Sequence, residues 1–148
     1  MVQNNVVRFF YDCPPFSFSE RNRLKKFISS LFKKEKRRLS SVHYVFCTDD
    51  ALRQMNKQFL NHPDYTDILT FPLSDKNQPI EGEIYISIDR IKYNSLIFNT
   101  SFKSEFLRVV FHGALHLCGY NDHSSQEIKK MRERENHYLR LYKDENKL

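Results

Sequence analysis

Residues 110–124 read V-F-H-G-A-L-H-L-C-G-Y-N-D-H-S, and this stretch predicts a helix, a stop and a return of the chain. His112 and His116 are four positions apart in a helical pattern of apolar residues, so they lie on one helix face about 6 Å apart. Gly119 is expected to end the helix, because glycine adopts the left-handed conformation at C′ without steric cost. The next residues, 120–123, then form a hairpin that brings the chain back towards the histidines.

A third metal ligand can come from this returning segment. Asp122 follows His116 by six positions and His123 follows it by seven. Three protein ligands with one open position are typical of a catalytic zinc site, whereas a structural site usually has four ligands. We therefore expect one Zn²⁺ ion per chain, although nickel or cobalt can bind the same nitrogen and carboxylate ligands. The alternative is a structural role for the histidines, because an HxxxH pair arises easily by chance.

Gly113, directly after the first histidine, distinguishes this pattern from that of a metalloprotease. Proteases with an HExxH motif have a glutamate there as the general base. The glycine therefore disfavours a protease, and we expect it to leave open space beside the metal for a bulky substrate. A zinc site of this kind can instead hydrolyse a phosphodiester.

The distribution of charge favours a nucleic-acid partner. The chain has 24 Lys and Arg against 18 Asp and Glu, a net charge of +6. Residues 21–38 contain nine basic residues and one acidic residue, Glu35. Such a concentrated positive surface is typical of proteins that bind phosphate backbones. A solvated helix face is the alternative reading of the same charges.

Length and composition predict one domain over residues 1–148, because 148 residues with 40% hydrophobic side chains can form a single core. The three cysteines, Cys13, Cys47 and Cys118, are odd in number and widely spaced, which indicates a reducing compartment. The sequence contains neither a secretory signal pattern nor an apolar run of membrane-spanning length. We therefore expect a cytoplasmic protein with no membrane partner.

Periodic patterns predict the order of the helices and strands. Strands are expected at 6–11, 39–47, 67–73 and 83–88, and helices from 17, from 48 to a break at 62–64, at 89–96, at 101–117 and at 124–141. Capping boxes at Ser17 with Glu20 and at Ser124 with Glu127 predict the starts of the first and last helices. The order βαβαββααα indicates an α+β domain with a four-stranded mixed sheet and about five helices.

Three segments resemble the YbeY family, the bacterial metal-dependent endoribonucleases of ribosomal RNA maturation. H-G-A-L-H-L-C-G-Y at 112–120 resembles the family signature H-G-x-L-H-L-x-G-Y. Y-T-D-I-L-T-F-P at 65–72 and G-E-I-Y-I-S at 82–87 resemble two further family blocks, in the same order. The resemblance implies the same α+β architecture and single-strand-specific cleavage of RNA. It also implies a ribosomal RNA precursor as substrate and small-subunit ribosomal proteins as partners.

The sequence departs from the family at the third ligand. The family has G-Y-D-H, with a histidine six positions after the second histidine, but here the loop is one residue longer. Asp122 therefore occupies the ligand position and His123 is displaced by one. We favour His123, because imidazole is the commoner ligand and a loop can absorb one residue, with Asp122 as the alternative.

A second departure concerns a family arginine that follows L-N-x-x-[FY]. Here Leu60 stands in its place, and Arg53, seven positions earlier on the same helix, is a hypothetical substitute. Arg108 lies one turn before His112, so it can neutralise a phosphate, or else pair with a neighbouring carboxylate.

Asp67, inside the second family block, can orient a ligating histidine or simply cap a turn. The departures also favour an alternative function, a ribosome-associated RNA-binding factor whose metal is structural.

Overall fold

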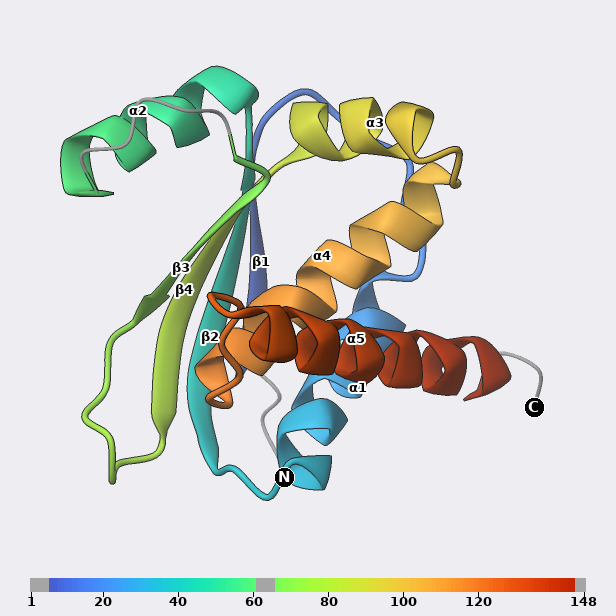
Figure 1. Ribbon diagram of the computed structural model, residues 1–148. Helices are drawn as coiled ribbons and strands as arrows, with labels where there is room; N and C mark the ends of the chain where they lie inside the picture. The colour runs from blue at the N-terminus through green and yellow to red at the C-terminus, as the bar shows by residue number, and fades with distance from the viewer. Residues whose placement is uncertain (1–5, 61–65, 146–148) are drawn as a thin grey trace.

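The computed structural model describes residues 6–60 and 66–145, and it confirms the predicted order of elements (Figure 1). The elements are β1 (Val7–Asp12), α1 (Arg21–Lys34), β2 (Leu39–Cys47), α2 (Asp49–Leu60), β3 (Ile68–Pro72), β4 (Ile80–Ser87), α3 (Ile88–Ile97), α4 (Phe102–Leu117) and α5 (Ser125–Glu145). The predicted break at 62–64 lies outside the described residues. In the part of the chain that is described, no helix is both long and apolar enough to cross a membrane.

The four strands form one mixed sheet in the order β1-β2-β4-β3. β2 pairs in parallel with β1 and with β4, whereas β3 pairs antiparallel with β4 and forms an edge of the sheet. Parallel strands need a crossover connection, and α1 supplies it between β1 and β2. The predicted α+β class with a mixed sheet is therefore confirmed.

Alternation along the strands directs two sets of side chains to opposite faces of the sheet. Tyr44 and Ile84 are fully buried on the face that α1 and α4 cover. On the other face, Leu69 packs with Leu52 of α2 in a second, smaller cluster. In Figure 1, α4 runs diagonally along the first face and α5 lies across its C-terminal half.

Helix α4 is seated very close to the sheet at Gly113. A Cβ atom at this position would lie 2.9 Å from Ile68 Cδ1 and 2.9 Å from Ile84 Cγ2. The Tyr44 hydroxyl, on a fully buried side chain, donates a 2.8 Å hydrogen bond to the Val110 carbonyl and holds α4 against β2. Gly113 therefore serves helix-to-sheet packing, and the expectation that it leaves open space beside the metal was wrong.

The last helix was predicted to end near 141, but α5 continues to Glu145. Two predicted starts were also wrong, for reasons visible in the contacts. Ser17 does not cap α1, which begins at Arg21 with Glu20 at its N-cap. The Glu20 carboxylate instead accepts hydrogen bonds from Lys103 at 2.5 Å and from the Tyr142 hydroxyl at 2.8 Å, which ties α1 to α4 and α5. Strand β4 begins three residues before its predicted start, because residues 80–82 already pair with β2.

The close packing of α4 against the sheet predicts that Gly113→Ala lowers the free energy of unfolding, although a change from glycine to alanine within a helix usually raises it. Helix propensity alone favours alanine by about 1 kcal/mol. Because the added methyl group overlaps Ile84 and Ile68, we expect a loss of about 1–3 kcal/mol in the free energy of unfolding, measured by urea denaturation. Ser104→Ala, at an exposed position of the same helix, is the control and should leave stability nearly unchanged. A more stable Gly113→Ala protein would contradict the close packing.

Candidate metal centre

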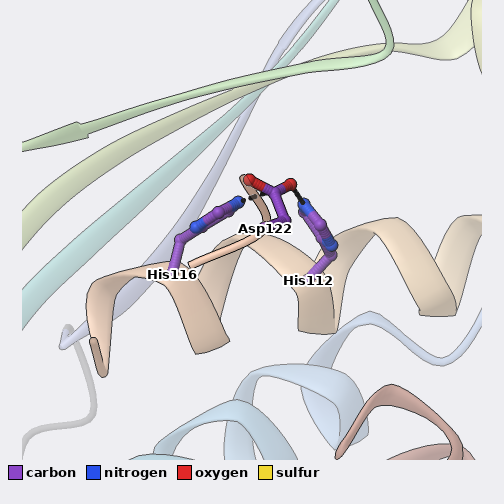
Figure 2. A group of neighbouring side chains, drawn as sticks. All are labelled: His112, His116 and Asp122. Atoms are coloured by element: carbon purple, nitrogen blue, oxygen red, sulfur yellow. Dashed lines mark ion pairs between the residues drawn. The ribbon is translucent and has the colours of Figure 1, made fainter. Parts of the chain in front are cut away.

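Three side chains converge on one point above α4: His112, His116 and Asp122 (Figure 2). The Asp122 Oδ2 atom lies 3.4 Å from His112 Nε2 and 3.3 Å from His116 Nε2. Two ligand atoms at zinc-bond lengths and at the tetrahedral angle are about 3.3 Å apart. The spacing therefore fits a single small ion, and it is longer than an ordinary N–H···O hydrogen bond.

The loop that supplies Asp122 is shaped by the end of α4, as the sequence predicted. Gly119 adopts a φ of +111°, and the Tyr120 amide donates to the Leu115 carbonyl at 3.1 Å, which closes the helix. The predicted capping box at Ser124 is confirmed, since Ser124 Oγ accepts from the Glu127 amide at 3.1 Å and Glu127 Oε1 accepts from the Ser124 amide at 2.9 Å. The segment between the end of α4 and the start of α5 carries Asp122 back over the helix face.

Each imidazole is oriented through its second nitrogen. His116 Nδ1 lies 2.9 Å from the Tyr120 carbonyl, which can only accept, so the proton is on Nδ1 and the lone pair is on Nε2. His112 Nδ1 lies 2.6 Å from Glu135 Oε2 and donates to that carboxylate in the same way. Both Nε2 atoms therefore face Asp122 and can present a lone pair to a metal ion when the rings are neutral.

The same contacts decide the protonation of the site. Burial disfavours a charge on both imidazoles. It lowers the pKa of His116, and the neighbouring His112 lowers it further. At His112 the hydrogen bond and the charge of Glu135 outweigh burial and raise the pKa. Burial likewise opposes the charge of Glu135, but its bonds to His112 and Arg108 lower its pKa, so it remains an ionised acceptor.

The three side chains lie in a groove of about 960 Å³ between α4 and the edge strand β3. Charged side chains along this groove comprise four carboxylates and two guanidinium groups: Asp67, Glu105, Asp122, Glu135, Arg108 and Arg132. Burial raises the pKa of Asp67 and of Glu105, and the charge of Asp67 raises that of Glu105 further. Buried charges are usually paired or bound to metals, so one divalent cation would balance this excess of negative charge.

The predicted site residues fall into two groups. Arg108 lines the groove, where it donates to Glu135 Oε1 at 2.8 Å and to Asn136 Oδ1 at 2.9 Å. His123 also lines the groove, but it is exposed and is not one of the three clustered ligands. Arg53 lines a separate depression on α2 with Asp50, Gln54 and Lys57. Asp67 lies in the groove wall, and the carboxylate that holds His112 is Glu135.

Glu135 lies at this site, but its role was not predicted from the sequence. It is 4% exposed and comes from α5, where it shares the buried face with Met131, Tyr138 and Tyr142. The sequence does contain an indication that Glu135 has a buried partner, because an acidic residue on an otherwise apolar helix face needs one. The sequence does not say which partner that is, since His112 is 23 positions away.

The fold and the groove define a single-domain α+β protein with a cluster of two histidines on α4 and one carboxylate from the following loop that could hold a metal ion. The family model described as "Endoribonuclease YbeY" matches residues 16–143, and the chain belongs to this family. It is 39% identical to "Endoribonuclease YbeY" of Cytophaga hutchinsonii over 142 residues, which cover 96% of this chain and 99% of that one. The protein of the same name from Azobacteroides pseudotrichonymphae is 45% identical over 103 residues, which cover 70% of this chain and 73% of that one.

A solved structure supports the same fold. The solution structure of TM1509 from Thermotoga maritima superposes with a TM-score of 0.63 at 29% identity. The match covers 95% of this chain and 91% of that one.

The geometry makes a clear prediction about the third ligand. Asp122→Asn should lower metal affinity by more than the roughly 10- to 100-fold that loss of an outer-shell partner costs, because a neutral amide replaces the carboxylate. His123→Ala should bind metal like the parent protein. Competition with a chromophoric chelator measures both affinities. The reverse result would show that the loop rearranges and that His123 completes the site.

A second prediction concerns Glu135. In Glu135→Gln the charge that favours Nδ1 protonation of His112 is lost, so metal affinity should fall by about 10- to 100-fold without loss of the fold. Glu133→Gln, at an exposed position of the same helix, is the matched control and should leave affinity unchanged. Equal affinities for the two variants would mean that Glu135 does not orient His112.

Proposed function

We propose that this protein is a single-strand-specific, metal-dependent endoribonuclease that hydrolyses RNA phosphodiesters in ribosomal RNA processing. The observation that carries the proposal is the convergence of His112 Nε2 and His116 Nε2 on Asp122 Oδ2, at 3.4 Å and 3.3 Å. Family membership supports RNA as the substrate class. The ligand set favours one Zn²⁺ ion per chain, with nickel or cobalt as chemically acceptable substitutes.

The residues of the groove have different roles in the proposed reaction. When bound, a zinc ion supplies Lewis-acid polarisation of a phosphoryl oxygen and a nucleophile from water at neutral pH. Glu135 and the Tyr120 carbonyl hold the imidazoles with Nε2 free for the ion. Each of the three ligand side chains retains 20–35% exposure, so an RNA strand has access to the ion.

Arginine side chains provide the electrostatic contacts to RNA. Arg108 lies one turn from His112 and is held by Glu135 and Asn136, so its guanidinium is preorganised for a phosphate next to the scissile bond. Arg53 lies outside the groove lining and can contact only RNA that extends beyond it, and we retain it as a hypothetical phosphate contact there. With Leu60 at the position of the family arginine, we assign the main electrostatic role to Arg108.

One observation favours a second candidate function. Many of the basic side chains between residues 21 and 38 are exposed on α1 and just after it, so they can bind RNA independently of the groove. A ribosome-associated RNA-binding factor with a structural metal would need only this surface. In either case we propose an RNA partner together with small-subunit ribosomal proteins, and a cytoplasmic location.

Metal content and cleavage together test the proposal. We expect one zinc ion per purified chain and cleavage of a structured ribosomal RNA fragment within its unpaired segments. Cleavage should stop on chelation and return with added zinc, because the ligands remain in place. His112→Ala should lose both metal and cleavage.

The control for that experiment is His43→Ala, which removes a histidine on β2 that does not line the groove. It should retain metal and cleavage. Metal retained without any cleavage in the parent protein would instead support the RNA-binding factor with a structural ion.

A further inference from the structure

The C-terminal end of α3 exposes three consecutive apolar side chains. Leu96 is 81% exposed, Ile97 is 56% exposed and Phe98 is 62% exposed. A contiguous exposed apolar run of this kind is unfavourable in water unless it has a binding role. Among the three, Phe98 also lines the groove that contains the metal ligands. The run is therefore connected to the candidate site.

The position of Phe98 is fixed by the backbone around it. Its amide donates to the Asn94 carbonyl at 2.9 Å, and the Thr100 amide donates to the Ser95 carbonyl at 2.9 Å. Asn99 between them adopts a φ of +54°, in the left-handed region. No ring contact to Phe98 occurs among the described residues. The backbone of Phe98 is thus fixed beside the groove, and the 62% exposure of Phe98 leaves its ring accessible to a ligand.

Phe98 and Asp122 line the same groove and come from the segments that precede and follow α4. Figure 1 shows α3 meeting the N-terminal end of α4, whereas the loop that carries Asp122 lies at its other end. His112 is ten positions after Phe102 in the helix, which at 1.5 Å per residue is on the order of 15 Å. Arg108 lies between the two ends. A strand bound along the groove would pass from the ring, past a guanidinium, to the metal ligands.

We propose that Phe98 is a stacking platform for an unpaired RNA base a few nucleotides from the scissile phosphate. Every base has a flat face that stacks on an aromatic ring, and only unpaired bases can turn that face outwards. Asn94 and Thr100 line the same groove and offer an amide and a hydroxyl to the edge of the base. This inference rests on the proposed function and adds the subsite that selects unpaired nucleotides.

The test uses binding of a short unstructured RNA to the metal-loaded protein, followed by fluorescence anisotropy. Phe98→Ala should weaken binding by about 5- to 100-fold, the range for loss of one base stack. Phe98→Trp should restore binding, because it keeps an aromatic face. Leu96→Ala is the matched control, since Leu96 is more exposed but does not line the groove. Metal content should be equal in all variants.

A set of RNAs with one abasic nucleotide at successive positions identifies the stacked base. One position should weaken binding to the parent protein and have no further effect in Phe98→Ala. Equal RNA affinity of Phe98→Ala and the parent would overturn the proposal and would assign the apolar run to a protein partner. Anisotropy is read in the first seconds after mixing, before turnover of the RNA, so the stacking subsite can hold even if the proposed catalysis fails.

Discussion

The approach of α4 to the sheet is the constraint on which the candidate metal centre depends. At Gly113 the helix backbone lies so close to β4 that a side chain would overlap Ile84, and the Tyr44 hydroxyl holds the preceding turn. Successive residues of a helix point about 100° apart, so one neighbour of Gly113, Ala114, is turned into the core, whereas the other is turned towards the groove. His112 is this second neighbour. A glutamate at position 113 would point into the interface, so this architecture has no room for a protease base at that position.

Local signals in the sequence predicted much of the fold and part of the site. The end of the helix at Gly119 and the capping box at Ser124 depend on neighbouring residues alone, and both were predicted correctly. The choice between Asp122 and His123 depends on the path of a loop, where one residue reverses the direction of a side chain, and the structure brings Asp122 to the imidazoles. Glu135 depends on how α5 docks, which no local pattern specifies.

Glu35 shows how the basic segment is connected to the metal loop. It is the single acidic residue between positions 21 and 38. Its carboxylate accepts hydrogen bonds from the hydroxyls of Tyr120 and Tyr138 and from Arg134. Burial opposes its charge, but these bonds lower its pKa. Glu35 therefore points inwards and leaves the positive surface uninterrupted, while it fixes the residue that orients His116.

The spacing of the ligands along the chain also affects how metal binding and folding are linked. His112, His116 and Asp122 fall within eleven consecutive residues. An unfolded chain can still bring such near neighbours around an ion, whereas it cannot bring Glu135 to His112. Any affinity of the unfolded chain for the ion reduces the stabilisation that the ion gives to the native state. The folded chain is thus required for the orientation of His112 by Glu135, which comes from a distant part of the sequence.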